Sequence, residues 1–193
     1  MDLKRCLSGC PILEDLLTID IRKATEGGFE TALSNLVRAT ISPFDITFKA
    51  IYNVEFLRII KMDEIDHNKN INAYYKDFPV FCNLIHLEIL FSDYDHSWNN
   101  VAKVLQHSPK LQILLIRKRS SNYYTYRKDW ESPNSIPECV SSHLKTCTII
   151  NYEGWKGDIQ FSRYILKNAR FLQVMRVMVS RIASYRKSQI LEE

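Results

Sequence analysis

Two cysteines and a histidine stand at equal spacing in the C-terminal half of the chain and could bind a metal ion. Cys139, His143 and Cys147 follow one another at intervals of four residues. Thiolate and imidazole are the ligands that zinc most often takes in proteins. Cys147, however, falls on an apolar position of a strand pattern, and free cysteine packs as a small hydrophobic side chain. We therefore interpret both cysteines as buried structural thiols and predict no metal site.

The remaining cysteines do not indicate a disulfide framework. The chain has five cysteines, an odd number, and residues 1–21 carry four acidic side chains, which is unlike a secretory signal. Cys6 and Cys10 share one face of a possible helix, but no second ligand pair lies near them. These features are typical of an intracellular protein, and we expect it in the cytoplasm, the nucleus or both.

The other groups that could do chemistry also have simpler explanations. Residues 141–143 read Ser-Ser-His, but a catalytic triad needs convergence in space, which adjacency does not supply. Asp63, Glu64 and Asp66 could pair as carboxylates, although a solvated loop explains them better. The glycine-rich phosphate-binding and nucleophile-elbow motifs do not occur in the sequence. We therefore predict no enzyme, no catalytic residue and no cofactor.

A basic and aromatic segment offers an alternative chemistry. It combines cations with tyrosines at Arg117, Lys118, Arg119, Tyr123, Tyr124, Tyr126, Arg127 and Lys128. Such a mixture suits phosphate contacts and base stacking on single-stranded nucleic acid. Arginine and tyrosine are equally typical of protein–protein interfaces, so we treat nucleic-acid binding as the alternative function.

Composition and charge place these residues in an ordinary globular chain. Of 193 residues, 46% are hydrophobic and 25% are charged, and no apolar run is long enough to cross a membrane. The net charge of +4 divides unevenly: residues 1–109 carry 11 basic and 15 acidic side chains, and residues 110–193 carry 15 and 7. The basic half can face an acidic partner or simply be solvated. No membrane partner is expected.

A repeated leucine motif organises the whole chain. Its form is Leu-x-x-Leu-x-Leu with conservative replacements. The first copy in the chain reads either Leu13/Leu16/Thr18 or Leu16/Ile19/Ile21. The later copies are Leu36/Ala39/Ile41, Leu57/Ile60/Met62, Leu84/Leu87/Ile89, Leu111/Leu114/Ile116, Leu144/Cys147/Ile149 and Leu172/Met175/Val177. Their starts lie 23, 21, 27, 27, 33 and 28 residues apart, which is the spacing of leucine-rich repeats with one insertion.

This periodicity predicts the fold class. Each copy forms a short strand whose second and third apolar positions point to the same side. The segments between copies have helical spacing, as at Trp98, Val101 and Leu105, and Asp158 is a candidate N-cap for a last helix. The prediction is an α/β fold: a short, curved leucine-rich-repeat solenoid with a parallel sheet on its concave face and helices on its convex face.

The concave face is the predicted place for a partner. Residues between the buried positions point to it. They are Arg38, Thr40, Ile59, Lys61, Asp63, His86, Glu88, Leu90, Ile113, Leu115, Arg117, Thr146, Thr148, Ile150, Val174, Arg176 and Met178. From these we select as partner-binding candidates Lys61, Glu88, Leu90, Ile113, Leu115, Arg117 and Arg176. Leu90, Ile113 and Leu115 are expected to form a contiguous apolar patch.

Two stretches of the sequence resemble a known family. Residues 9–16 (GCPILEDL) resemble the repeat signature of plant F-box leucine-rich-repeat proteins. Residues 130–133 (WESP) and 136–145 (IPECVSSHLK) look like the opening of the FBD domain that follows such repeats. Residues 161–178, with YILKNA at 164–169, are similar to the second half of that domain.

The resemblance implies both an organisation and a function. It divides the chain into leucine-rich repeats at 1–120, a loop insertion at 121–137, an FBD domain continuing the stack at 138–185 and a tail at 186–193. It also implies the substrate-binding part of a Skp–cullin–F-box ubiquitin ligase receptor, with an unidentified target protein as partner. The Leu-Pro dipeptide that opens an F-box does not occur in the sequence, so a Skp-type adaptor is expected only if an F-box is supplied upstream. A truncated fragment without independent function is the other alternative.

Overall fold

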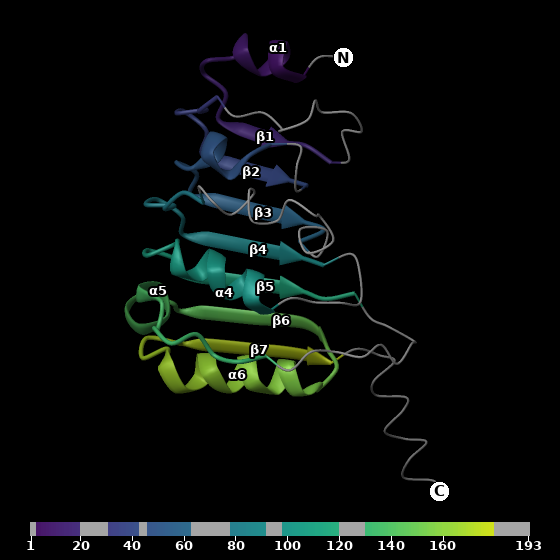
Figure 1. Ribbon diagram of the computed structural model, residues 1–193, viewed down its shortest axis with the longest axis vertical. Coiled ribbons are helices and arrows are strands. Elements are labelled where there is room, and N and C mark those ends of the chain that lie inside the picture. Colours follow the sequence, from purple (N-terminus) through teal and green to yellow (C-terminus); the bar gives the residue numbers. More distant parts are fainter. Residues whose placement is uncertain are drawn as a thin grey trace, which may run out of the picture.

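The computed structural model describes residues 3–19, 31–42, 46–62, 78–91, 98–119 and 130–179. Seven parallel strands form one sheet, stacked in chain order along the long axis of the molecule (Figure 1). The strands are β1 Asp15–Leu17, β2 Arg38–Ile41, β3 Phe56–Ile60, β4 His86–Leu90, β5 Ile113–Arg117, β6 Thr146–Tyr152 and β7 Val174–Val179. The predicted fold class, a mixed α/β stack resembling a leucine-rich-repeat solenoid, is confirmed.

Helices return the chain between several of these strands. They are α1 Leu3–Ser8, the short 3-10 helix η1 Phe48–Ile51, α4 Trp98–Gln106, α5 Glu138–Ser142 and α6 Lys156–Asn168. Helices α1 and α4 end shortly before Pro11 and Pro109, whose rings do not allow the helix to continue. Within the described ranges no helix is both long enough and apolar enough to cross a membrane.

The backbone register fixes which side chains enter the core. Ala39, Leu57, Leu87 and Leu114 face one another across β2 to β5, and Cys147 and Met175 continue the row. A second row, two residues further along each strand, runs from Ile41 to Val177. In β2 to β6 both rows are fully buried and join the helices in one hydrophobic core.

The register settles the first repeat and corrects the third. Leu16 pairs with Ala39 and Thr18 is buried, which confirms the Leu13/Leu16/Thr18 copy. The Leu57/Ile60/Met62 copy is wrong, because the third repeat is Val54/Leu57/Ile59. The run from 56 to 62 offers apolar residues to both faces of the sheet, so leucine spacing alone could not fix its register. The three concave-face positions expected for this repeat, Ile59, Lys61 and Asp63, are therefore reassigned below.

Asparagines hold the turns that lead into the N-terminal strands. The side-chain amide of Asn35 donates to the carbonyl of Pro11 at 2.7 Å, and that of Asn53 donates to the carbonyl of Ser34 at 2.9 Å. Asn83 in turn donates to the side chain of Asn53 at 2.7 Å. These bonds join each turn to the one before it and align the start of each strand with its neighbour.

A buried ion pair lies in the C-terminal part of the stack. The Lys118 side chain, just after β5, has no exposed surface, and its Nζ lies 2.8 and 2.6 Å from the two carboxylate oxygens of Asp158. A second carboxylate, that of Glu153, lies 4.0 Å from the same nitrogen. Asn151, with a φ of 60°, donates its side-chain amide to the Lys118 carbonyl at 2.8 Å. The pair thus joins the ends of β5 and β6 to the first turn of α6.

This pair overturns two expectations from the sequence. Asp158 is not the N-cap of the last helix, because α6 begins at Lys156 with Trp155 as its N-cap. Lys118 is not a surface cation of a nucleic-acid loop, because Asp158 engages it in the interior. A lysine ammonium buried at this depth needs a carboxylate partner, and only the fold brings one forty residues distant in the chain next to it.

The ion pair generates a stability prediction. Replacing Lys118 with Met leaves the Asp158 carboxylate buried without its cation, and we expect the free energy of unfolding to fall by about 3–5 kcal/mol. The double change Lys118→Met and Asp158→Asn removes both charges and should cost clearly less. Urea denaturation followed by circular dichroism measures both values. Lys110 is exposed, and Lys110→Met is the matched control: its free energy of unfolding should lie within about 0.5 kcal/mol of the wild-type value. An equal loss of stability in Lys110→Met and Lys118→Met would contradict the buried ion pair.

Candidate functional site

The equally spaced cysteines are structural. Cys139 is buried in α5 and its Sγ donates to the carbonyl of Leu105 at 3.3 Å, whereas Cys147 belongs to the core row of β6. Burial raises the pKa of each thiol to about 12, so neither is a thiolate at neutral pH. In the described segments no three His, Cys, Asp or Glu side chains gather as a metal would require. Cys6 and Cys10 are both exposed, at α1 and just after it.

The serine–histidine stretch serves the end of α5. The Ser141 hydroxyl donates to the carbonyl of Glu138 at 3.1 Å and lies 3.2 Å from the Ser142 hydroxyl. His143 is the C-cap residue of this helix, and its backbone N–H donates to the Cys139 carbonyl at 2.9 Å. The hydroxyls therefore bond within their own turn. The carboxylates Asp63, Glu64 and Asp66 lie outside the described residues.

The basic segment is divided by the structure. Lys118 is buried, whereas Arg117 and Arg119 are exposed at and after the end of β5. The other members, Tyr123, Tyr124, Tyr126, Arg127 and Lys128, lie outside the described residues. The nucleic-acid alternative therefore loses Lys118, because its charge is neutralised by Asp158 in the interior.

The open face of the sheet carries the candidate partner site. We use this name for the side opposite the buried rows, and it consists of three rows of residues taken in strand order. The first row is Asp15, Arg38, Phe56, His86, Ile113, Thr146 and Val174. The second is Leu17, Thr40, Arg58, Glu88, Leu115, Thr148 and Arg176. The third is Ile60, Leu90, Arg117, Ile150 and Met178.

Most of the candidate residues lie on this face as predicted. Glu88 faces Leu115 in the second row, and Leu90 faces Arg117 in the third. Ile113 stands in the first row, so it shares a strand with Leu115 but is not beside Leu90. Arg117 is exposed, and the other four are partly buried. Hence Ile113 and Leu115 form the centre of the predicted apolar patch, and Leu90 lies diagonally across from Leu115.

The shifted third repeat displaces the remaining candidates. Ile59 is fully buried in the core, so its placement on the open face is wrong. Lys61 follows β3 with a φ of 59° and stands beyond the last row rather than within it. Asp63 lies outside the described residues. Their places are taken by Phe56, Arg58 and Ile60, which the repeat pattern had hidden because its register was three residues too late.

The N-terminal half of the open face is occupied by its own charge network. Arg58 donates to the Glu88 carboxylate at 2.6 Å, and Arg38 lies 3.5 Å from the Asp15 carboxylate. Both guanidinium groups also sit over the Phe56 ring, at 4.4 and 5.6 Å from its centre. These side chains satisfy one another across four strands, which leaves little free charge for a partner.

His86 completes this network and is sensitive to pH. Its ring packs edge-on against Phe56 at 4.9 Å, and its Nε2 lies 3.3 Å from a Glu88 carboxylate oxygen. Burial lowers the pKa of His86 below its usual 6.5, more strongly than the Glu88 carboxylate raises it, while Arg38 and Arg58 lower it further. The folded protein thus favours the neutral imidazole.

The shift of His86 predicts an acid-dependent loss of stability. Because the pKa is lower in the folded state, the unfolded chain takes up this proton first. The contribution of the neutral His86 ring to the free energy of unfolding is therefore fully present above pH 6.5, and it is lost as the pH falls below 6.5. The free energy of unfolding, measured by urea denaturation across this range, should fall more steeply for the wild type than for His86→Gln. Parallel curves for the two proteins would contradict the prediction.

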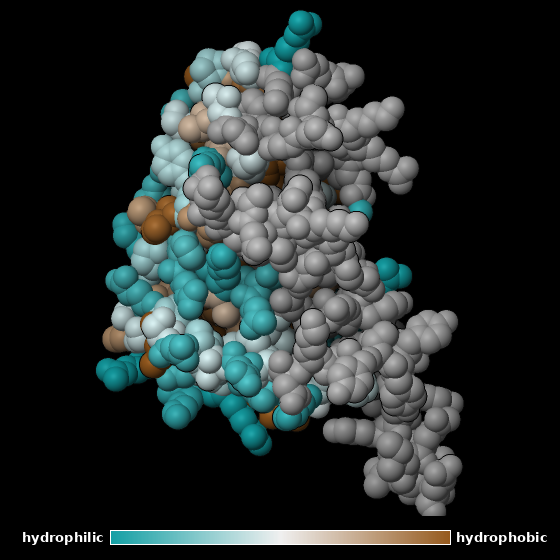
Figure 2. Space-filling model, in the orientation of Figure 1, coloured by the Kyte–Doolittle hydropathy of each residue, from teal (hydrophilic) through white to brown (hydrophobic). Residues whose placement is uncertain are grey.

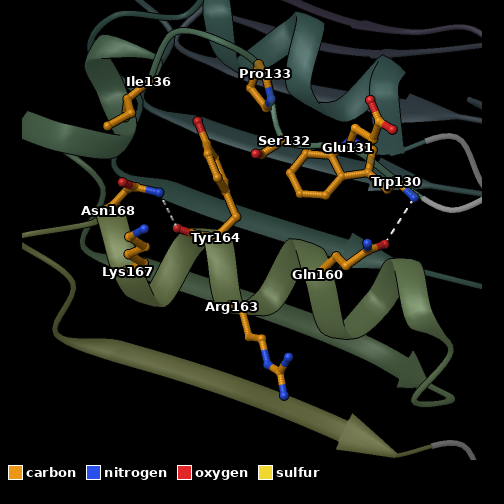
Figure 3. A pocket seen from close by; sticks show the side chains of 10 residues that line it. All are labelled: Trp130, Glu131, Ser132, Pro133, Ile136, Gln160, Arg163, Tyr164, Lys167 and Asn168. Carbon is orange, nitrogen blue, oxygen red and sulfur yellow. Dashed lines mark hydrogen bonds between the residues drawn. The ribbon is translucent and has the colours of Figure 1, made fainter.

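A separate groove lies between α6 and the segment at 130–137 (Figure 3). It has a volume of about 690 Å³ and an aromatic wall in which the Trp130 and Tyr164 rings are 5.4 Å apart. The Trp130 backbone N–H donates to the Gln160 side chain at 3.1 Å, which holds the segment against the helix. Arg163 and Lys167 line the groove as exposed cations. The sequence did not indicate this groove, because its two walls are thirty residues apart in the chain.

Comparison with known proteins identifies this C-terminal region. The FBD family model matches residues 131–177, which contain α5, β6, α6 and most of β7. An FBD domain lies in this chain. The predicted resemblance is thus confirmed, whereas the limits of 138–185 expected for the FBD domain remain a prediction.

The relatives carry the same name. An F-box/FBD/LRR-repeat protein of Arabidopsis thaliana is 34% identical over 100 residues, which cover 51% of this chain and 22% of that protein. A second is 32% identical over 150 residues, 76% of this chain and 33% of the relative. A third is 28% identical over 215 aligned positions, 86% and 49% of the two chains. The chain thus spans about a fifth to a half of these relatives. No solved structure matches the chain.

Proposed function

We propose that the protein is a protein-recognition module, the target-binding part of a Skp–cullin–F-box ubiquitin ligase receptor. The names of its relatives favour an adaptor or receptor over an enzyme. In such a receptor, repeats would hold the target while an F-box holds the adaptor. This role places the protein in the cytoplasm, the nucleus or both.

The observation that carries the proposal is the composition of the open face. Between the charged network of β1 to β4 and the last strand, partly exposed aliphatic side chains come to the surface at Ile113, Leu115 and Ile150. Leu115 and Ile150 lie next to the exposed Arg117. On the described part of the molecular side shown in Figure 2, hydrophilic residues predominate and hydrophobic ones reach the surface in small separate spots. An aliphatic centre with a charged rim is the usual anatomy of a protein interface.

Replacing the aliphatic centre should abolish target capture. We expect Ile113→Asp with Leu115→Asp to weaken binding at least tenfold, because each carboxylate would have to be desolvated against an apolar partner surface. The proteins retained by the immobilised wild type and by the variant are compared by quantitative mass spectrometry. A retained protein is then purified and titrated against both chains.

The matched control is a leucine outside the open face. Leu166 lies on α6 with 60% of its surface exposed, and Leu166→Asp should leave capture unchanged. Circular dichroism and urea denaturation check that the double variant folds. A folded double variant that captures the same protein with the wild-type affinity would rule out the open face as the target site.

Adaptor binding gives an independent prediction. The family resemblance assigns docking on a Skp-type adaptor to the F-box, and we expect no capture of the purified adaptor by this 193-residue chain. A fusion with an F-box placed ahead of Met1 should capture it. Both are measured by pull-down with equal amounts of bait. Adaptor binding by the chain without an F-box would show a docking surface among the repeats or the FBD domain.

A further inference from the structure

The arginines of the open face fall into two groups. Arg38 and Arg58, on β2 and β3, have carboxylate partners on the neighbouring strands, Asp15 and Glu88. Arg117 and Arg176, on β5 and β7, have no such partner: the described residues offer no carboxylate within ion-pair distance of either. Both side chains are exposed. Among the described residues, the C-terminal half of the face therefore presents positive charge without an acidic partner.

Two acidic side chains that follow β6 do not neutralise these arginines. Glu153 and Asp158, which follow β6, are buried and lie around Lys118. The Trp155 indole also donates to the Glu153 carboxylate at 2.9 Å. The other residues of the open face on β5 to β7 are uncharged: Ile113, Leu115, Thr146, Thr148, Ile150, Val174 and Met178. Positive charge and aliphatic surface thus coincide.

The register also gives the spacing of the two cations. Arg117 faces Ile150, whereas Arg176 faces Thr148, two residues earlier along the sheet. Adjacent strands lie about 4.8 Å apart and residues rise about 3.3 Å along a strand, so the two Cα atoms are roughly 12 Å apart. An extended peptide covers that distance in three or four residues. Ile150 lies on β6, the strand between the two arginines, and Leu115 precedes Arg117 by two residues on β5. These two aliphatic side chains could receive an apolar side chain of the peptide.

We propose that the β5–β7 half of the open face binds an acidic segment of the target protein, with carboxylates about three or four residues apart on either side of an apolar side chain. This inference rests on the proposed function and specifies the chemistry of the partner. Opposite charges steer encounter and fix orientation, while the aliphatic centre supplies buried apolar area. Single-stranded nucleic acid fits less well, because these strands present no aromatic ring to the open face for base stacking.

A random peptide library tests the inference without a known target. The full 193-residue chain is immobilised, an mRNA-displayed library of linear peptides is selected on it, and the composition of the enriched peptides is read by sequencing. For the wild type we expect enrichment of Asp and Glu around an aliphatic or aromatic residue. An enriched peptide should lose at least tenfold in affinity for Arg117→Glu with Arg176→Glu, and less for Arg117→Gln with Arg176→Gln. The charge-reversed variant should itself select basic peptides.

The matched control reverses two charges elsewhere. Arg163→Glu with Lys167→Glu alters the groove beside α6 and should leave the selected composition unchanged. Circular dichroism and urea denaturation establish that each variant folds. A single-stranded RNA oligonucleotide is titrated in parallel, and an affinity above that of the enriched peptides, lost in Arg117→Glu with Arg176→Glu, would overturn the acidic-peptide inference in favour of nucleic acid.

The remaining outcomes separate this inference from the function on which it rests. Peptides without acidic enrichment that depend on Ile113 and Leu115 would overturn the inference while leaving the open face as the target site. Another outcome is that enriched peptides bind normally to Ile113→Asp with Leu115→Asp and to Arg117→Glu with Arg176→Glu, and lose affinity for Arg163→Glu with Lys167→Glu. That result would overturn the inference and the proposed site together. If the immobilised chain enriches no peptide above a selection on the support without protein, the inference is overturned.

Discussion

The parallel backbone ladder is the constraint on which the rest of this structure depends. A repeat of this kind cannot bury its apolar side alone, and it becomes stable only when a neighbour pairs with it in register. A slip of one residue would exchange the core row with the open face. The ladder continues beyond the strands, where the Val37 N–H bonds to the Glu14 carbonyl and the Gln173 N–H to the Lys145 carbonyl. The core rows and the open face are thus fixed by the same bonds.

The FBD region belongs to this stack physically as well as in sequence. Trp98 of α4 stacks on Phe161 of α6 with ring centres 4.2 Å apart, and Cys139 of α5 bonds to the carbonyl of Leu105. The Lys118–Asp158 pair adds a charged contact across the same boundary. Strand pairing of β5 with β6 runs through it without a shift. A domain defined by a family match is here the closing part of a solenoid and shares its core.

The distribution of charge along the open face follows from the strand order. Arginines of β2 and β3 find carboxylates on adjacent strands, and Phe56 lies beneath both guanidinium groups. Those of β5 and β7 find uncharged neighbours. One half of the face is therefore internally satisfied, and the other has charge and apolar surface still to be matched. Charges that are already paired within the face are less available to complement a partner, so recognition is expected at the unsatisfied half.

The sequence by itself determined the repeats, the parallel α/β stack and the family resemblance. It also determined most of the open-face residues, because the alternation of side chains between the two faces of a short strand is a local property. Tertiary structure alone decided the register of the third repeat, where apolar residues suit either face and the turn at Val54 selects one. It also decided that Lys118 is buried and Arg117 exposed, although they are adjacent. Lys118 needs Asp158, and only the packing of α6 against the end of β5 brings that carboxylate within 2.8 Å.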